Sequence, residues 1–334
     1  MNTPLPTTAV QAPDSAHTAM QRLRDYLESE VIGQQALVER LLIALLTGGH
    51  VLVEGAPGLA KTRAVKALAA GLEADFHRIQ FTPDLLPADL TGSDVYHPED
   101  GSFRFQKGPV FHNLLLADEI NRAPAKVQSA LLEAMGESQV TVGARSYPLP
   151  RLFLVMATQN PIEQEGTYPL PEAQLDRFEF HVRVDYPSRE ASRDILRLVR
   201  SEALDAAAAG HSVEPLPQAT VFAARDEVLR LHLAEPVEAY IVELVEASRT
   251  PATYAAELAD WVRWGASPRG AISLERGARA HAWLAGRDFV TPEDVQAVAP
   301  DALRHRILLN YEAEAEGVTA QQFIEALLSR VPAP

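Results

Sequence analysis

The sequence predicts an α/β fold with a five-stranded parallel sheet, followed by a second domain made of helices. Along the first half of the chain, short apolar runs alternate with segments whose apolar residues recur at helical spacing. This alternation is typical of a parallel sheet with helices on both faces. After Pro187 the helical spacing dominates, and we place a domain boundary there.

The five expected strands are apolar runs bounded by glycine, proline or polar residues. They lie in the segments HVLVEG (50–55), FHRIQF (76–81), NLLLADEI (113–120), RLFLVMATQNP (151–161) and RFEFHVRVDYP (177–187). Two further segments, at about 92–108 and 138–150, interrupt the alternation. The first contains Asp100-Gly101 between extended halves and the second turns near Gly143, so both are expected to be β-hairpins inserted into the core.

Composition narrows the classes of function. The net charge of −15 and the pI of 5.1 disfavour nonspecific binding to nucleic acid or to an anionic membrane, because the field of the protein repels phosphate. The chain has no cysteine, which excludes a disulfide framework and a thiolate metal site and fits a cytoplasmic location. No apolar run reaches about 18 residues, so no membrane insertion is expected. Residues 1–18 are rich in Pro and Thr and are expected to form a flexible tail.

Residues 55–62 read GAPGLAKT and lie between an expected strand and an expected helix, which is the setting of a phosphate-binding loop. In the pattern G-x-x-x-x-G-K-[ST], Lys61 would reach the β- and γ-phosphates of a nucleotide and the Thr62 hydroxyl would bind Mg²⁺. Backbone N–H groups between Pro57 and Thr62 would hold phosphate oxygens at the N-terminus of the helix. The alternative is a glycine-containing turn with a surface Lys-Thr pair, which the flanking strand and helix disfavour.

One residue departs from the phosphate-loop pattern, because Ala60 stands where the second glycine is expected. We expect Ala60 to have the backbone conformation of a helix start, which alanine adopts readily. Gly55 and Gly58 remain at positions where the turn needs glycine. On this interpretation the loop tolerates the missing glycine.

Three polar residues follow other expected strands and would join the loop, because ligands bind at the carboxyl ends of parallel strands. Asp118 suits Mg²⁺, through water, and Glu119 would polarise the attacking water. The same pair could be an ordinary acidic helix start. Asn160 would position that water or contact the γ-phosphate, although Asn before Pro is also a common turn pair.

Arginines outside the loop are candidates for stabilising the charge that develops on a transferred phosphoryl group. Arg177 precedes the fifth expected strand and could act on a neighbouring subunit, but a salt bridge with Asp176 or Glu179 fits the local sequence equally well. Arg269 starts an expected helix, where the helix dipole disfavours a cation unless an anion is also present. Arg122, in EINRAP, is a candidate of the same kind.

Taken in order, five motifs resemble those of the MoxR family of AAA+ ATPases, from about residue 20 to the C-terminus: GAPGLAKT, LLLADEINRAP, ATQNP, GTYPLPEAQLDRF and GASPRG. The resemblance implies a P-loop NTPase αβα core over 19–187, a helical lid domain over 188–334, and assembly as a ring, usually a hexamer. Alanine commonly precedes the lysine in the phosphate loop of this family, as Ala60 does here. ATP and Mg²⁺ are the implied cofactors.

The resemblance also implies a role for each residue of the nucleotide site. Lys61 and Thr62 resemble Walker A, Asp118 and Glu119 resemble Walker B, and Asn160 resembles sensor 1. The segment VIGQ resembles the wall of the adenine pocket. The implied nucleotide-binding residues are Val31, Ile32, Gly33, Gly55, Pro57, Gly58, Leu59, Ala60, Lys61, Thr62 and Arg63.

The resemblance extends to residues beyond that site. Arg177 resembles the arginine finger that acts on the neighbouring subunit, and Arg269 resembles sensor 2 of the lid. The hairpins at 92–108 and 138–150 resemble the helix-2 insert and the presensor-1 hairpin. These insertions define a wider clade that includes magnesium chelatase ATPase subunits, dynein and replicative helicases.

Members of the family act as chaperone-like machines, often with a partner that carries a von Willebrand factor A domain, in the maturation of metal- or cofactor-containing enzymes. We therefore expect a ring-forming, Mg²⁺-dependent ATPase that remodels a protein client, with Glu119 as the base. A nucleic-acid motor is disfavoured, because the hairpin at 138–150 has only Arg145 as a positive charge. A non-hydrolysing nucleotide switch is disfavoured by the presence of Glu119, Asn160 and Arg177. A chelatase ATPase subunit shares the whole core and is set apart only by the closer resemblance to MoxR.

Overall fold

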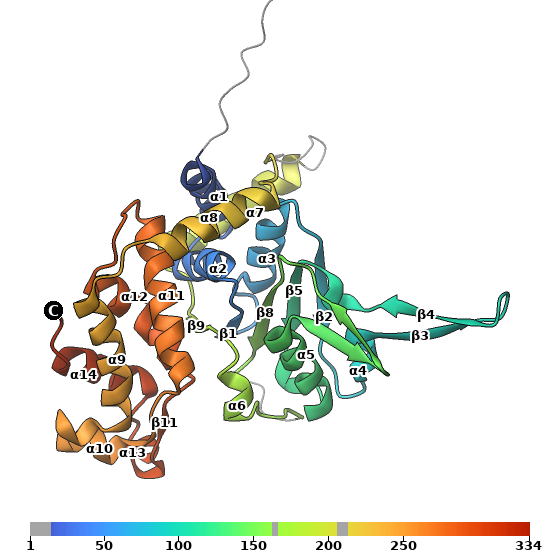
Figure 1. The fold of residues 1–334 in the computed structure, drawn as a ribbon. Helices are drawn as coiled ribbons and strands as arrows, with labels where there is room; N and C mark the ends of the chain where they lie inside the picture. Colours follow the sequence, from blue (N-terminus) through green and yellow to red (C-terminus); the bar gives the residue numbers. More distant parts are fainter. Residues whose placement is uncertain (1–14, 162–165, 206–212) are drawn as a thin grey trace, which may run out of the picture.

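A five-stranded parallel sheet lies at the centre of the molecule (Figure 1). The computed structural model describes residues 15–161, 166–205 and 213–334. The strand order is β2-β5-β8-β1-β9, and each neighbouring pair is parallel. The strands are β1 (Val51–Gly55), β2 (Phe76–Gln80), β5 (Leu114–Asp118), β8 (Leu154–Gln159) and β9 (Phe180–Val184). The α/β fold with a parallel sheet, predicted from the sequence, is confirmed.

The two faces of the sheet belong to separate hydrophobic layers, because successive side chains of a strand point to opposite faces. Val51 and Val53 lie in one layer and Leu52 lies in the other. The first layer includes α1 (Ala16–Glu30), α2 (Gln35–Thr47) and α3 (Lys61–Ala70). The second includes α4 (Pro87–Thr91) and α5 (Ala125–Glu137). In this three-layer arrangement the carboxyl ends of β5, β8 and β1 lie side by side.

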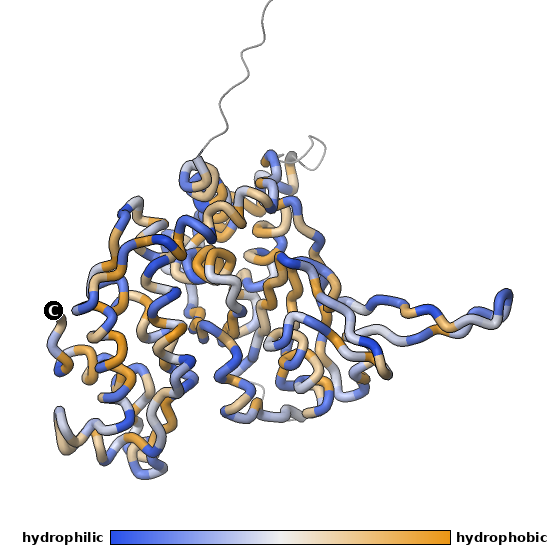
Figure 2. Tube along the Cα trace, viewed as in Figure 1, coloured by the Kyte–Doolittle hydropathy of each residue, from blue (hydrophilic) through white to orange (hydrophobic). Residues whose placement is uncertain are grey.

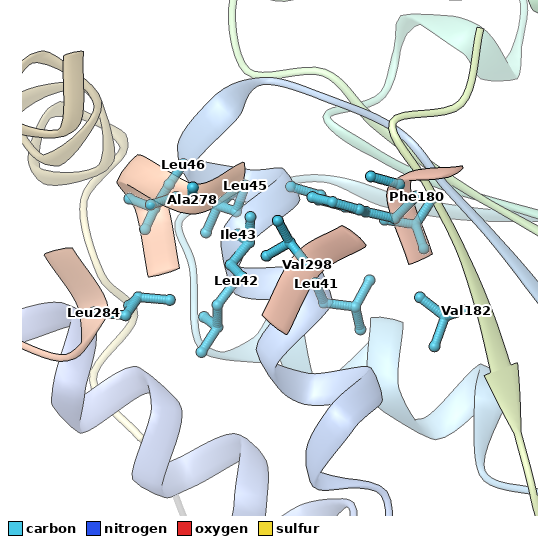
Figure 3. Packing of buried hydrophobic residues seen from close by; sticks show 14 of the residues in the cluster. Leu41, Leu42, Ile43, Leu45, Leu46, Phe180, Val182, Ala278, Leu284 and Val298 are labelled. Atoms are coloured by element: carbon cyan, nitrogen blue, oxygen red, sulfur yellow. The ribbon is translucent and has the colours of Figure 1, made fainter. Parts of the chain in front are cut away.

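Helix α2 connects the sheet with the C-terminal helices. Seven consecutive buried positions, 40–46, include Leu41, Leu42 and Ile43, so the helix is buried on nearly all sides and packs against neighbours all round. Figure 3 shows these side chains in one cluster with Phe180 of β9 and with Val298 of a C-terminal helix. The sheet and the C-terminal helices therefore share one hydrophobic cluster.

After residue 187 the chain is mostly helical. The helices are α7 (Arg189–Asp205), α8 (Gln218–Arg230), α9 (Glu235–Arg249), α10 (Ala256–Trp261), α11 (Pro268–Leu284), α12 (Pro292–Leu303), α13 (Tyr311–Ala315) and α14 (Ala320–Arg330). From the sequence, the first of them is expected to end at Gly210, which lies outside the described residues. Among the helices of the described ranges, none is both long enough and apolar enough to cross a bilayer. The division into core and lid at Pro187 stays a prediction.

The sequence predicts a helix over AAELADWVRW (255–264), and this part of the helical prediction is wrong, because the segment is not helical to its end. Helix α10 stops at Trp261, and β10 (Val262–Trp264) pairs antiparallel with β11 (Leu308–Leu309). The Asn310 backbone N–H donates to the Trp261 carbonyl at 2.8 Å. This pairing with a distant segment outweighs the local helical pattern, which the sequence alone does not reveal.

Both hairpins expected from the sequence are present. The first joins β3 (Gly92–His97) to β4 (Ser102–Lys107) and the second joins β6 (Gln139–Val142) to β7 (Arg145–Pro148). The first projects far from the rest of the molecule (Figure 1), and its outer end is hydrophilic, whereas hydrophobic residues gather along the sheet (Figure 2). The hairpins contact each other where Phe105 stacks on Tyr147, with ring centroids 4.0 Å apart.

The N-terminal helix begins earlier than the sequence suggests. Helix α1 starts at Ala16, so residues 16–18 are not part of a flexible tail. Ser15 accounts for this start, because its hydroxyl accepts a hydrogen bond from the Thr18 N–H at 3.1 Å and caps the helix. Residues 1–14 of the expected tail lie outside the described residues.

Candidate functional site

The glycine-containing loop connects β1 to α3, as expected. Gly58 has a φ of 83°, a left-handed conformation that glycine adopts without steric cost. Gly55 is needed for a different reason, since a Cβ there would lie 2.7 Å from the Val184 carbonyl oxygen of the neighbouring strand β9. Gly55 therefore permits a close approach of two strands, whereas Gly58 permits the turn.

Ala60 does not have the helix-start conformation expected from the sequence. Its φ of 59° and ψ of 12° lie in the left-handed region. Ala60 is the residue that caps α3, so the loop completes its turn there before Lys61 enters the helix. A residue with a side chain costs about 1–2 kcal/mol in this conformation. The missing glycine is therefore a source of backbone strain and not a neutral replacement.

A cavity of about 440 Å³ lies between this loop and the carboxyl ends of β2, β5 and β8. It is lined by Pro57, Gly58, Leu59, Ala60, Lys61, Thr62, Arg63, Arg78, Gln80, Asp118, Glu119 and Asn160. The structure thus brings together the loop, both acids and Asn160 from three separate segments. Lys61 Nζ donates to the Gly55 carbonyl at 2.6 Å. Burial lowers the pKa of Lys61, and the nearby carboxylates oppose that effect.

Asp118 and Glu119 stand at the end of β5 and are fixed by Thr158 of β8. The Thr158 hydroxyl donates to Asp118 Oδ1 at 2.6 Å and accepts from the Glu119 N–H at 2.9 Å. Glu119 has a φ of 58° and a ψ of 51°, which is uncommon for a residue with a side chain. Such conformations persist only where the surroundings impose them, and they cluster at functional sites. Glu119 is therefore, with Ala60, one of two strained residues that line the cavity.

Two polar residues of β2 belong to the site and were missed from the sequence. Arg78 donates to Asp118 Oδ2 from Nε at 3.1 Å and from Nη2 at 2.7 Å. Gln80 donates to Glu119 Oε2 at 2.7 Å. The only signal was their alternation with buried Ile79, which places both on one face of the strand. Their partners could not be inferred, because the sequence does not show that β2 lies beside β5.

The residues present fit a Mg²⁺–nucleotide complex. Asp118 and Thr62 offer the oxygen donors that Mg²⁺ prefers, and both line the cavity. The loop N–H groups precede a helix of 10 residues, whose N-terminus favours phosphate. Arg78 pairs with the carboxylate of Asp118, so the guanidinium and a metal ion would compete for the same group.

The segment 31–33, expected at the adenine, lies beside the loop but is not among the described residues that line the cavity. Arg63, just after the loop in α3, bonds to Glu30, just before the segment. Its Nε donates to the Glu30 carbonyl at 2.5 Å, and its Nη2 lies 2.8 Å from the Glu30 carboxylate. Val31 is 1% exposed and packs in the hydrophobic layer. Contact of Val31 and Ile32 with adenine stays a prediction.

Arg177 and Arg269 lie together in a second cavity of about 290 Å³, which also contains Arg306. Among the described residues, the linings of this cavity and of the loop cavity have no residue in common. Arg122, by contrast, lies 2.9 Å from the Glu119 carboxylate of its own chain. The two arginines expected to stabilise transition-state charge are thus together, and apart from the loop of their own chain.

Comparison with known proteins gives two family matches. The model of the "ATPase family associated with various cellular activities (AAA)" matches residues 50–180, and the model of the "AAA lid domain" matches residues 255–327. The first match contains the loop, both acids, Asn160 and Arg177, and the second contains Arg269.

Individual relatives match nearly the whole chain. Chaperone MoxR1 of Mycobacterium tuberculosis is 46% identical over 312 residues, which are 91% of this chain and 79% of that protein. The uncharacterized protein YeaC of Bacillus subtilis is 42% identical over 327 residues, which are 96% and 97% of the two chains. A crystal structure of a proposed ATPase from Cytophaga hutchinsonii has a TM-score of 0.88 and 49% identity, with 96% of each chain covered.

Proposed function

The chain belongs to the MoxR family of chaperone-like AAA+ ATPases, and from this premise we propose that it is a Mg²⁺-dependent ATPase that works as a ring and remodels a protein client. One observation supports the proposal above all others. The loop, the two acids and Asn160 line one cavity at the carboxyl ends of the strands, although they come from three separate segments. Nucleotides bind at this edge of parallel sheets.

Glu119 is the group best placed to accept a proton from the attacking water. Its carboxylate lies at the cavity, where Gln80 donates to it at 2.7 Å. Asn160 is 7% exposed, lines the same cavity and would orient the water. A positioned base of this kind contributes about 10²–10⁴ in rate.

Lys61, Thr62 and Asp118 would hold the phosphates and the metal. Lys61 would exchange the Gly55 carbonyl for phosphate oxygens, and the loop N–H groups would bind the remaining oxygens. Thr62 and Asp118 would ligate Mg²⁺, which when bound neutralises charge on the phosphates. Arg78 would then leave Asp118 to the metal.

The placement of the arginines supports a site shared between subunits. Arg177 and Arg269 line a cavity separate from the loop of their own chain, so each would act on the nucleotide of a neighbour. Arg122 already pairs with Glu119 of its own chain, which favours Arg177 as the residue supplied in trans. An arginine supplied in this way contributes about 10³–10⁵ in rate in other nucleotide hydrolases.

The remaining parts of the proposal depend on family resemblance. We place the protein in the cytoplasm, as a hexamer, with a partner that carries a von Willebrand factor A domain and a client that needs a metal or cofactor. The presensor-like hairpin at 138–150 has Arg145 as its only Lys or Arg, so it offers little charge to nucleic acid.

Substitution of Glu119 by Gln tests the assignment. The variant should bind ATP with a Kd within about threefold of the wild-type value, while kcat falls by about 100-fold or more, because only the proton acceptor is lost. Glu133→Gln is the matched control, because Glu133 is exposed on α5 away from the cavity, and it should leave both values unchanged. Wild-type turnover by Glu119→Gln would refute the role of this residue. If turnover is lost, the same variant with ATP can capture the client for mass spectrometry.

A further inference from the structure

Arg306 follows α12 and is bonded to the segment that carries Arg177. Its side chain is 2% exposed. Nε donates to Asp176 Oδ1 at 2.8 Å, and Nη2 donates to the Asp176 carbonyl at 3.2 Å and to the Phe178 carbonyl at 2.7 Å. Nη1 donates to the Glu179 carbonyl at 3.1 Å. One buried guanidinium thus holds the backbone on both sides of Arg177.

The Asp176 carboxylate also contacts the N-terminal end of α11. The Ser267 hydroxyl lies 2.9 Å and 3.0 Å from the two carboxylate oxygens of Asp176, and Arg269 Nη1 lies 3.5 Å from Oδ2. The same carboxylate therefore contacts Arg306, Ser267 and Arg269. Arg177, which precedes β9 of the sheet, and Arg269, at the start of α11, therefore lie around one carboxylate.

The geometry of the contact requires arginine. Three nitrogens of one planar group reach Asp176, Phe178 and Glu179 at once, and a guanidinium presents its five N–H donors in a fixed fork. A lysine ammonium could pair with the carboxylate of Asp176 but could not span the three residues. Residue 306 therefore needs the geometry of the guanidinium as well as its positive charge.

We propose that Arg306 is a positioning residue that holds Arg177 and Arg269 as one unit on the face presented to the neighbouring subunit. The inference rests on the proposed function, in which those arginines act in trans. It adds a route by which the C-terminal helices set the arginine finger, because Arg306, Ser267 and Arg269 all follow Pro187 whereas Arg177 precedes it. A purely structural role would instead require only that Arg306 keep the fold stable.

The first test is the substitution Arg306→Lys. Its kcat should fall by about 100-fold, as expected for misplacement of a catalytic group by about 1 Å. Binding of a fluorescent ATP analogue should stay within about twofold of wild type, because the loop cavity is not touched. Arg304→Lys is the matched control, because the Arg304 side chain is only 11% exposed and donates to the His181 carbonyl at 2.6 Å, yet does not contact residues 176–179. Arg304→Lys should retain most of the wild-type ATP turnover.

Mixed rings distinguish positioning from loss of fold. Arg306→Lys mixed with Lys61→Ala should recover activity, since some interfaces then combine an intact loop with intact arginines. Arg306→Lys mixed with Arg177→Ala should not recover activity, because neither variant supplies a correctly positioned Arg177. Recovery in the second mixture, or wild-type turnover by Arg306→Lys alone, would overturn the proposal.

Two further measurements keep the outcome decisive. If Arg306→Lys does not fold, Asp176→Asn replaces it, since Asp176 is 18% exposed and its loss frees the same groups; wild-type turnover by that variant would overturn the proposal.

The reference mixture of Lys61→Ala and Arg177→Ala reports on the proposed function itself. If that mixture recovers activity and the Arg306→Lys mixture with Lys61→Ala does not, the positioning role fails alone. If neither recovers in assembled rings, the trans arrangement and the positioning role fail together.

Discussion

Replacement of Ala60 by glycine should stabilise this protein, although alanine is normally the better residue at a helix. Ala60 has a φ of 59°, and relief of that conformation is worth about 1–2 kcal/mol. The glycine adds freedom to the unfolded chain, which costs about 0.4–1 kcal/mol. The net gain is therefore about 0.5–1 kcal/mol, measured as a higher urea midpoint at an unchanged slope. ATP affinity should be largely unchanged, because the loop N–H groups keep their places.

Two variants bracket this prediction. Ala70→Gly, on an exposed position at the end of the same helix, should lower stability by up to about 1 kcal/mol, because it relieves no strain. Ala60→Val should impair both stability and ATP binding, because a β-branched side chain is poorly tolerated at positive φ. If Ala60→Gly destabilised the protein as much as Ala70→Gly does, the reasoning about strain would be refuted.

Three other features give predictions of their own. Arg78→Ala should lower the Mg²⁺ concentration that half-saturates ATP binding by about two- to fivefold, because a partly exposed ion pair with Asp118 is lost; an unchanged or higher requirement would contradict the competition. Burial raises the pKa of Glu179 from 4.5 to about 7, so the folded state keeps a proton that the unfolded chain loses, and stability falls as pH rises through this range. Glu179→Gln should therefore gain about 3 kcal/mol over wild type between pH 4.5 and pH 7, at about 1.36 kcal/mol per pKa unit, and parallel unfolding profiles would count against the shift. A double-mutant cycle between Phe105 and Tyr147 should show a coupling energy of about 0.5–1.5 kcal/mol in urea unfolding, and zero coupling would mean that the stacked contact does not join the hairpins.

The sequence could predict features that depend on local pattern. The strand, loop and helix around Lys61 follow from short-range spacing, as does the position of Asp118 at the end of an apolar run. The turns of the two hairpins were identified from Gly101 and Gly143, and both have positive φ in the structure. Such features need only the conformational preferences of a few adjacent residues.

Features that depend on strand order and packing could not be predicted. Arg78 reaches Asp118 only because β2 is paired with β5. Arg306 contacts Asp176, 130 residues earlier, and nothing in its own neighbourhood marks it among the other arginines of the C-terminal helices. The left-handed conformation of Ala60 is imposed by the turn of the whole loop, so the local preference of alanine for a helix start gave the wrong expectation.

The central claim is that each active site combines the loop of one subunit with the arginines of another. It is tested most directly by the ATP turnover of Lys61→Ala and Arg177→Ala proteins, each inactive alone, mixed in varied ratios at constant total concentration. The account predicts turnover that rises from near zero at both ends to a maximum near equal amounts. No turnover at any ratio, in rings shown to contain both variants, would contradict it.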